Sequence, residues 1–295
     1  MTHELAAAID LGTNTALCLV ARLDSADRCE IVEDHCLMPR LGGAAAADGT
    51  LNPEAVERAL AALEFFAGRL AELNVRPERV RAVSTAVLRR APDARAFVEL
   101  ARARSGLALE IISGDEEARL GRIAVRAEGA TDATIVIDVG GGSTEVSCAE
   151  LQLRVSLPIG AVVLAAVRPR ATAQARIDAA VAGLPAHLAD GRDVIVLGGT
   201  GVNLACLALG LARFDHERAE GVRVDAQAAR EFAQRLAALS LPERLALPIE
   251  AARADILPEG MAVLAGVLER LGAKNLRVTG RGLRFGVVRE LLESR

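Results

Sequence analysis

Residues 133–150 read ATIVIDVGGGSTEVSCAE. An apolar run ends at Asp138, a glycine-rich turn follows, and a second extended run begins after Ser143. Two extended runs joined by a short glycine-containing turn are typical of a β-hairpin. Residues 5–22, LAAAIDLGTNTALCLVAR, repeat this order, with Asp10 in the position of Asp138, a glycine two residues later and a hydroxyl residue five residues later. The same hairpin is therefore predicted twice.

Asp10 and Asp138 lie 128 positions apart, a spacing too long for a solenoid repeat, and it indicates a duplicated domain. Stretches with helical periodicity alternate with short apolar stretches in both halves, as in an α/β protein. We expect a first lobe at 1–120 and a second at 121–295, with a last helix at about 282–293 that packs back on the first lobe. Other helices are expected at 53–73, 92–105, 114–127, 172–188, 225–239, 258–271 and from about 203, with single strands at 79–85, 109–113, 194–199 and 276–280.

The composition argues against several classes of protein. Of 295 residues 52 % are hydrophobic, enough for packed cores, yet no apolar run reaches the roughly 18 residues of a membrane helix. The net charge of −4 and an aromatic content of 2 %, without Trp or Tyr, argue against a nucleic-acid partner. Five scattered cysteines without a CxxC pair, and an N-terminus unlike a secretory signal, favour a cytoplasmic protein that has no membrane partner.

Both predicted turns have the chemistry of phosphate binding. Glycine lets backbone N–H groups converge on an anionic oxygen, and hydroxyl groups add donors. The aspartates repel phosphate, but they can hold a divalent cation, or the water around it, that neutralises phosphate. Either turn alone also fits ordinary turn chemistry, whereas two turns in matching positions point to phosphate more strongly. The hydroxyl residues are Thr13, Thr15, Ser143 and Thr144, and the aspartates are Asp10 and Asp138.

Three glutamates deserve separate consideration as catalytic groups. In the segment 111–120, IISGDEEARL, Ser113 and Glu116 have the spacing of a capping box, so Glu116 is expected to bond back to the helix start. Glu117 points about 100° further round the helix and is not needed for that cap, although the helix dipole alone also favours an acid there. Glu145 follows the second glycine turn, where a purely structural carboxylate is unusual because its burial is unfavourable.

Seven segments occur in the order of one known family: AAIDLGTNT, STAVLRRA, IISGDEEARL, VIDVGGGSTE, LPIGAVVL, LGGTGVNLA and GLRFG. On these motifs the chain resembles, over essentially its whole length, the Ppx/GppA family of exopolyphosphatases and guanosine pentaphosphate phosphatases, within the actin-like ATPase superfamily. The resemblance implies an α/β fold of two ribonuclease-H-like domains with an interdomain cleft. It also implies a metal-assisted hydrolase that releases terminal phosphate from inorganic polyphosphate or pppGpp, with Mg²⁺, or alternatively Mn²⁺, as cofactor.

The resemblance also suggests roles for individual residues. Glu117 matches the catalytic base, and Asp138 and Glu145 match carboxylates that organise metal and attacking water; Asp10, in the equivalent place of the first hairpin, is expected to be a further metal ligand. Arg89 of STAVLRRA matches an arginine that contacts phosphate. The predicted phosphate-binding residues are Gly12, Thr13, Asn14, Thr15, Arg89, Gly140, Gly141, Gly142, Ser143, Thr144 and Thr200.

Two departures from the family pattern affect the expected substrate. Phe285 of GLRFG stands where the family often has an acidic residue, and the helical C-terminal domains of longer members have no counterpart here. A processive grip on long polyphosphate is therefore not expected, which favours short chains or pppGpp. Formation of a homodimer stays open.

Two other functions also stay open. Residues 194–203, VIVLGGTGVN, resemble the adenosine loop of the superfamily, which is compatible with an actin-like kinase or ATPase. A non-catalytic sensor that binds ppGpp or polyphosphate would need the same phosphate loops. The presence of Asp10, Glu117, Asp138 and Glu145 argues against lost catalysis.

Overall fold

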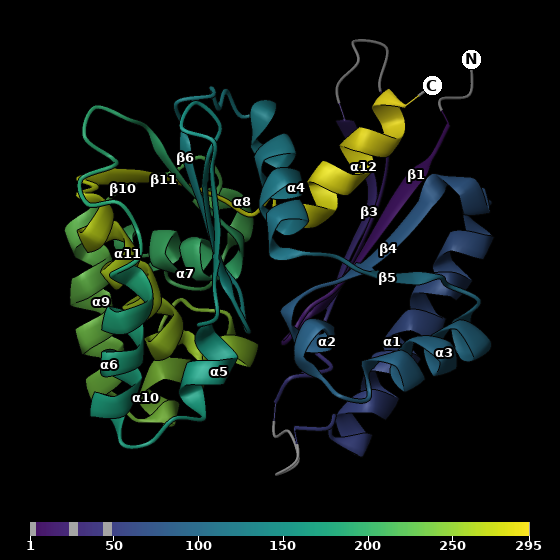
Figure 1. Cartoon of the computed structure of the whole chain (residues 1–295), viewed down its shortest axis with the longest axis horizontal. Coiled ribbons are helices and arrows are strands. Elements are labelled where there is room, and N and C mark those ends of the chain that lie inside the picture. Colours follow the sequence, from purple (N-terminus) through teal and green to yellow (C-terminus); the bar gives the residue numbers. More distant parts are fainter. Residues whose placement is uncertain (1–3, 24–28, 44–48, 295) are drawn as a thin grey trace. The chain divides into compact units, whose positions relative to one another are not determined.

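The computed structural model describes residues 4–23, 29–43 and 49–294. The chain forms two compact units, and each is built around its own β-sheet (Figure 1). The first unit comprises Met1–Val125 and Leu283–Arg295, and the second comprises Arg126–Gly282. The C-terminal segment therefore belongs to the unit that contains the start of the chain.

The first unit contains a five-stranded sheet in the order β3-β2-β1-β4-β5. Strands β1, β2 and β3 are antiparallel neighbours, and β4 and β5 run parallel to β1. Because successive side chains of a strand point to opposite faces, β1 buries Ala7, Ile9 and Leu11 in one core and Ala6 and Ala8 in another. The strands are β1 (Ala6–Leu11), β2 (Ala16–Leu23), β3 (Cys29–Leu37), β4 (Val80–Ser84) and β5 (Leu109–Ile111).

Helices cover both faces of this first sheet. Residues of α1 and α3 share the core that contains Ile9, and residues of α4 and α12 share the core that contains Ala8. Helix α1 begins at a cap, because the side chain of Asn52 accepts a hydrogen bond of 3.1 Å from the backbone N–H of Ala55. The helical elements are α1 (Pro53–Glu72), η1 (Pro77–Arg79), α2 (Ala86–Arg90), α3 (Ala94–Ser105), α4 (Gly114–Arg126) and α12 (Leu283–Glu293).

The last helix, α12, packs against β1 and β2, and its yellow ribbon lies beside the purple first strand in Figure 1. Phe285 is only 8 % exposed and packs in the same core as Leu120 and Val288. Its neighbour Arg284 donates two hydrogen bonds of 2.9 Å to the carboxylate of Asp34. A phenyl ring thus fills a hydrophobic layer at the position where the family pattern often has an acid.

The second unit contains a six-stranded sheet in the order β10-β11-β9-β6-β7-β8. Strands β6, β7 and β8 are antiparallel neighbours, β9 and β11 run parallel to β6, and β10 is an antiparallel edge strand. The strands are β6 (Ile135–Val139), β7 (Thr144–Cys148), β8 (Leu153–Leu157), β9 (Val194–Leu197), β10 (Arg223–Asp225) and β11 (Asn275–Thr279).

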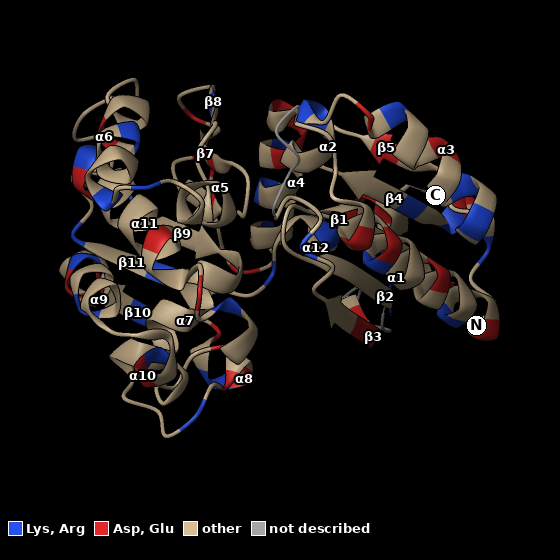
Figure 2. Ribbon diagram, turned by 90° about the horizontal axis from the view of Figure 1, so that it is seen from below, with Lys and Arg blue, Asp and Glu red and all other residues tan. Residues whose placement is uncertain are grey.

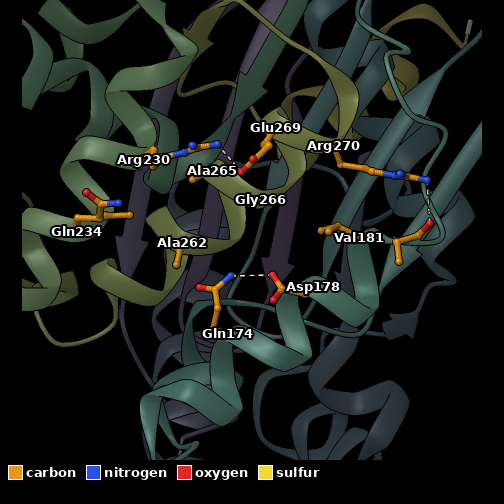
Figure 3. Close-up of a pocket in the computed structure, with 12 residues that line it drawn as sticks. Gln174, Asp178, Val181, Arg230, Gln234, Ala262, Ala265, Gly266, Glu269 and Arg270 are labelled. Atoms are coloured by element: carbon orange, nitrogen blue, oxygen red, sulfur yellow. Dashed lines mark hydrogen bonds and ion pairs between the residues drawn. The ribbon is translucent and has the colours of Figure 1, made fainter.

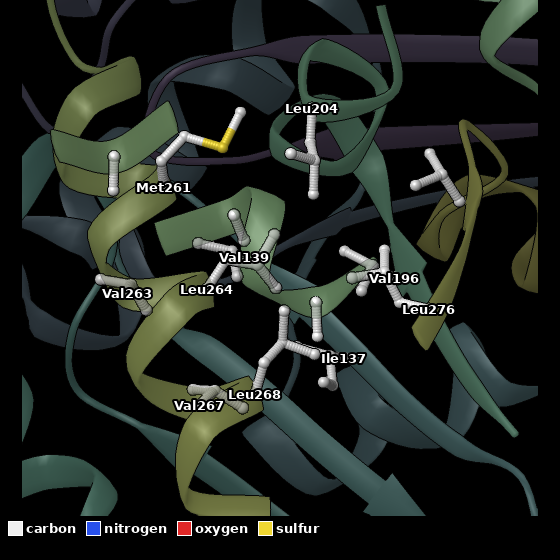
Figure 4. Packing of buried hydrophobic residues seen from close by; sticks show 14 of the residues in the cluster. Ile137, Val139, Val196, Leu204, Met261, Val263, Leu264, Val267, Leu268 and Leu276 are labelled. Carbon is white, nitrogen blue, oxygen red and sulfur yellow. The ribbon is translucent and has the colours of Figure 1, made fainter. Parts of the chain in front are cut away.

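The helices of the second unit bury a continuous apolar core against this sheet. Figure 4 shows Leu264 and Leu268 of α11 beside Ile137 and Val139 of β6 and Val196 of β9. The helical elements are α5 (Ala161–Ala165), α6 (Arg170–Val181), α7 (Gly198–Ala208), α8 (His216–Ala219), α9 (Ala226–Ala238), α10 (Leu241–Leu245), η2 (Ala251–Arg253) and α11 (Leu257–Leu271).

The two units share one topology. Strands β1 to β5 have the order 3-2-1-4-5, and β6, β7, β8, β9 and β11 have that order in the second sheet. Both predicted hairpins are present, as β1–β2 and β6–β7. The duplication predicted from the aspartate spacing is therefore visible as two sheets with matching strand order.

Several elements differ from the sequence expectation. The helix expected at 172–188 ends at Val181, because Gly183 and Pro185 follow, and the residue before a proline is disfavoured in a helix. The helix expected from about Asn203 begins earlier, at Gly198. The outer strands β3, β8 and β10 were not predicted at all.

Several helices of the first unit carry charged residues of both signs. Figure 2 shows both blue and red segments on α1 and on α3, so these helices present mixed charge to solvent. In the part of the chain that the structure describes, no helix has the length and apolarity needed to span a membrane.

Candidate phosphate-hydrolysis site

The first hairpin closes through a tight turn at residues 12–15. The backbone N–H of Gly12 donates to the carbonyl of Thr15 at 2.8 Å, and Asp10, near the end of β1, is paired with Leu17 of β2. The hydroxyl of Ser84 donates to the carbonyl of Leu11 at 2.7 Å and ties the end of β1 to β4. The turn therefore sits on a fixed base at the carboxyl end of two parallel strands.

A following segment covers the first turn. The N–H of Gly42 donates to the carbonyl of Thr13 at 2.9 Å, and the N–H of Arg40 donates to the carbonyl of Asn14 at 3.1 Å. A Cβ on Gly42 would lie 2.3 Å from Cγ2 of Thr13, so only glycine fits without displacing that side chain. Thr13 and Asn14 are accordingly buried.

The second hairpin repeats the closing hydrogen bond of the first turn. The N–H of Gly140 donates to the carbonyl of Ser143 at 3.0 Å, which matches the bond between Gly12 and Thr15. Asp138 is paired with Glu145 across β6 and β7, in the register that pairs Asp10 with Leu17 in the first hairpin. The two hairpins thus differ chemically at the position opposite the aspartate.

The second turn is held from behind by the residues that begin α5. The N–H groups of Ala161 and Val162 donate to the carbonyls of Gly140 and Gly141 at 3.0 Å and 2.9 Å. A Cβ on Gly160 would lie 2.6 Å from the carbonyl carbon and oxygen of Gly141. These two bonds fix the carbonyl groups of Gly140 and Gly141 toward the start of α5.

Two hydroxyl groups predicted to contact phosphate are used within the second unit. The Oγ1 of Thr144 donates to the carbonyl of Ile159 at 2.8 Å, and the Oγ1 of Thr200 donates to the carbonyl of Val139 at 3.2 Å. Each hydroxyl carries a single proton, so in this arrangement these two threonines fix the turn. Their contact with phosphate stays a prediction.

Asp138 and Glu145 form a pair of carboxylates beside the second turn. Directly paired residues of antiparallel strands point to the same face of a sheet, with Cβ atoms about 5 Å apart. Glu145 is 3 % exposed, and its Oε1 accepts a hydrogen bond of 2.7 Å from the hydroxyl of Ser156. A Cβ on Gly198 would lie 3.3 Å from Oδ1 of Asp138, so this glycine gives the carboxylate room.

This pair fits a small divalent cation. Mg²⁺ is commonly bound by one or two carboxylates together with water and substrate phosphate oxygens. Among the described residues, no group of three or more His, Cys, Asp or Glu side chains is gathered closely enough to hold a metal. Asp10, the third predicted ligand, belongs to the first unit, whereas Asp138 and Glu145 belong to the second.

In the first unit, Glu117 and Arg89 are brought together from separate motifs. Nη1 of Arg89, on α2, donates to Oε2 of Glu117, on α4, at 2.9 Å and also to the carbonyl of Ile112 at 2.9 Å. The Glu117 side chain is 12 % exposed and that of Arg89 is 22 % exposed. Arg89 was predicted to contact phosphate, and its Nε and Nη2 carry three further donors beyond the contact with Glu117.

The neighbouring Glu116 has a different environment. Its N–H donates to Oγ of Ser113 at 3.1 Å, which is one half of the predicted capping box. The other half is wrong, because the Glu116 carboxylate binds Arg119, at 2.6 Å and 2.8 Å, and Arg81, at 3.2 Å. These hydrogen bonds, with Arg119 foremost, lower the pKa of Glu116. Two arginines therefore hold this carboxylate, so it is a poor candidate for a catalytic base.

Sequence reasoning missed several residues that shape the turns. Gly42, Gly160 and Ser156 support them, and none carries a local signal of that role. At the start of α7, a Cβ on Gly199 would lie 2.5 Å from Cζ of Arg253, so the guanidinium lies directly against this glycine. The double glycine at 198–199 could have indicated such a close approach.

The comparisons with known proteins agree with this topology. The sequence model of the Ppx/GppA phosphatase family matches residues 19–295. A solved exopolyphosphatase-like protein is 27 % identical, with a TM-score of 0.85 and 98 % of each chain covered. An exopolyphosphatase from Cytophaga hutchinsonii is 22 % identical (TM-score 0.83, 98 % of each chain), and the Ppx/GppA family member from Aquifex aeolicus is 24 % identical (TM-score 0.78, 99 % of each chain). The resemblance and the two-domain, actin-like α/β fold are confirmed.

Proposed function

Because the chain belongs to the Ppx/GppA phosphatase family, we propose that it hydrolyses phosphoanhydrides and releases the terminal phosphate of short inorganic polyphosphate or of pppGpp. The observation that carries the proposal is the second hairpin, where Asp138 and Glu145 share a sheet face beside a turn built on Gly140. Such a turn offers N–H donors to phosphate oxygens, and the carboxylates offer ligands to the cation that accompanies phosphate. The name of the Cytophaga hutchinsonii relative supports the polyphosphate alternative.

In the proposed mechanism, the glycine turns hold the phosphate groups of the substrate through their N–H groups. Asp138 and Glu145 would hold the divalent cation, with Asp10 as a further ligand, and Ser156 keeps the Glu145 carboxylate oriented. When bound, a divalent cation such as Mg²⁺ neutralises phosphate charge and so lowers the barrier to attack.

Glu117 is the proposed general base, which accepts a proton from the attacking water. The hydrogen bond from Arg89 fixes the orientation of the carboxylate, and a second bond from the same Nη1 to the carbonyl of Ile112 fixes the arginine. Arg89 can bind the substrate phosphate through its remaining donors. A base must be correctly placed before its proton affinity matters, so this fixed geometry is the first requirement for catalysis.

The decisive experiment compares two adjacent glutamates on α4. Replacing Glu117 with Gln should reduce phosphate release roughly 10²–10⁴-fold, which is the usual contribution of a general base. Glu116→Gln is the matched control, and it should remain close to the wild-type rate because Glu116 is held by Arg119 and Arg81. Near wild-type turnover in Glu117→Gln, or an equal loss in both variants, would refute the assignment.

The substrate and the cation can be tested in the same assay. Phosphate release from short polyphosphate, long polyphosphate, pppGpp and ATP, measured side by side, separates the proposed substrates from those of a kinase or ATPase. Asp138→Asn should raise the Mg²⁺ concentration needed for half-maximal activity, because one ligand charge is lost. Asp178→Asn, an exposed aspartate of the same unit, should leave that concentration unchanged.

A further inference from the structure

Two hollows in the helical layer of the second unit differ in how their charged groups are paired. The larger, about 570 Å³, lies among α6, α9 and α11 (Figure 3). Its charged side chains already have partners: Gln174 binds Asp178, Arg230 forms an ion pair with Glu269, and Arg270 donates to the carbonyl of Ala182. None of these charged groups therefore points to a ligand.

The smaller hollow, about 180 Å³, is lined by three arginines and two acids. Arg168 and Arg170 lie at the start of α6, Arg244 belongs to α10, and Asp255 and Glu259 lie just before and in the first turn of α11. Since about 10–15 Å³ admits one water molecule, the hollow has room for a small oxyanion.

All three arginines donate hydrogen bonds to backbone carbonyls. Nη1 of Arg168 donates to the carbonyls of residues 165 and 167 at 2.8 Å each, and Nη1 of Arg170 donates to that of residue 237 at 2.7 Å. Arg244 donates to the carbonyls of residues 236 and 254 at 2.8 Å and 3.2 Å. A carbonyl orients a guanidinium without removing its charge, so three positive charges face two negative ones.

Glu259 gives the second, independent observation. It is 7 % exposed, and its Oε1 is 3.4 Å from Nη2 of Arg170. Its other oxygen, Oε2, is buried and accepts no hydrogen bond from the residues that the structure describes. Burying a carboxylate oxygen without a hydrogen-bond donor costs free energy. A ligand whose O–H group donates to that oxygen would remove this cost.

We propose that this hollow binds a protonated phosphate group, either orthophosphate or the terminal phosphate of a phosphate chain, outside the glycine turns. The anionic oxygens would face Arg168 and Arg244, whose forked donors suit phosphate. The P–O–H group would donate to Oε2 of Glu259. The pKa of Arg244 is lowered, chiefly by burial and also by the charges of Arg170 and Arg168, and an anion would relieve that crowding.

The hollow is connected to the second glycine turn through one residue. Gly260 follows Glu259, and a Cβ on it would lie 3.1 Å from Oγ1 of Thr200 and 3.3 Å from Cβ of Ala161. Thr200 holds the end of β6 and Ala161 holds the carbonyl of Gly140. A ligand that moved Glu259 would therefore act on the supports of the turn.

The need of Glu259 for a donor predicts that the hollow prefers phosphate to sulfate, because sulfate lacks the O–H group that phosphate carries at neutral pH. Calorimetric titration of the full chain without added metal should show phosphate bound more tightly than sulfate. Arg168→Ala should weaken phosphate binding roughly tenfold to a hundredfold, the contribution of a hydrogen bond to a charged group. Glu259→Gln, whose amide can donate, should shift the preference toward sulfate.

Controls separate this site from the proposed catalytic one. Arg176→Ala, an exposed arginine of the same helix α6, should leave phosphate affinity unchanged, and so should Glu117→Gln. Titration with tripolyphosphate distinguishes the two proposed ligands. If tripolyphosphate binds more tightly than orthophosphate and this binding is lost in Arg168→Ala, the ligand is the end of a phosphate chain. If tripolyphosphate binds more weakly, the ligand is free orthophosphate. Unchanged phosphate binding in both Arg168→Ala and Glu259→Gln, or an equal loss in Arg176→Ala, would overturn the proposal, whatever the activity assay shows.

Discussion

Replacing Gly160 with Ala tests whether the second glycine turn needs the close support seen in the structure. Gly160 has φ −161° and ψ 169°, an extended conformation that any residue can adopt. Backbone strain is therefore not the reason for glycine here. The reason is space, because the carbonyl groups of Gly140 and Gly141 lie where the side chain would begin.

The size of the effect follows from the distances. The added Cβ would lie 2.6 Å from the Gly141 carbonyl and 2.7 Å from the Gly140 oxygen. Nonbonded carbon contacts are comfortable at about 3.5–4.0 Å, so the turn has to move by roughly 1 Å. Overpacking of this kind destabilises by about 1–3 kcal/mol. A misplacement of about 1 Å in a catalytic arrangement can reduce the rate by about 10²-fold.

The assay pairs phosphate release with thermal unfolding of the same protein. Gly160→Ala should lose about two orders of magnitude in kcat/KM. Its Tm should fall by roughly 2–4 °C for each kcal/mol of destabilisation. The matched control is Gly183→Ala in the same unit, where the nearest atom to a new Cβ is the carbonyl oxygen of Ala180 at 3.9 Å. That variant should retain full activity and gain about 0.4–1 kcal/mol through the unfolded state.

Either of two results would show that this reasoning is wrong. If Gly160→Ala kept both the wild-type rate and the wild-type Tm, the turn would not rest against residue 160 as the distances require. If Gly183→Ala lost as much activity as Gly160→Ala, the loss could not be assigned to contact with the turn. A variant that kept its Tm and lost its rate would locate the effect in the geometry of the turn alone.

Two further predictions concern the β2–β3 side of the first unit. Hydrogen bonds from Arg69 and then His35 lower the pKa of Glu33 from 4.5 to about 2, so the stability that ionised Glu33 contributes is present above pH 4.5 and is lost as the pH falls toward 2. The difference in Tm between the wild type and Glu33→Gln should therefore shrink from pH 7 to pH 3, and a constant difference would contradict this. Burial raises the pKa of Cys18 to about 12, whereas Cys36 is exposed. A maleimide at pH 7 should therefore label Cys36 first and Cys18 only after unfolding, which peptide mass spectrometry can follow. Early labelling of Cys18 would contradict its burial.

The sequence was most informative where structure is local. The order of carboxylate, glycine and hydroxyl predicts both hairpins, because the bonds from Gly12 to Thr15 and from Gly140 to Ser143 join residues three apart. The outer strand β3, CEIVEDHCL, was missed because four of its nine residues are acidic or histidine and its apolar residues do not alternate regularly. Edge strands carry such residues because one side of them faces water, which removes the periodic signal.

Long-range partners could not be found in this way. The capping box correctly placed the N–H of Glu116 on Ser113, but Arg81, which lies 35 residues earlier, contributes to holding its carboxylate. The hydrogen bond between Arg89 and Glu117 likewise joins residues 28 positions apart, on α2 and α4. A capping interaction depends only on residues within one turn of the helix. The direction of a long charged side chain depends instead on which opposite charge the fold places near it.

The comparison of the two hairpins suggests that they do not have interchangeable roles. Equal register places Leu17 opposite Asp10 and Glu145 opposite Asp138. A cation beside Asp138 therefore meets a second carboxylate from the adjacent strand, whereas beside Asp10 the adjacent strand offers only an apolar side chain. Since Mg²⁺ binding by protein usually requires one or two carboxylates as well as phosphate oxygens, the second hairpin is the better equipped of the two to hold the cation. On this argument Leu17→Glu would add a carboxylate to a turn whose backbone already matches its counterpart, and it should create cation binding in the first hairpin if the opposing acid is what distinguishes them.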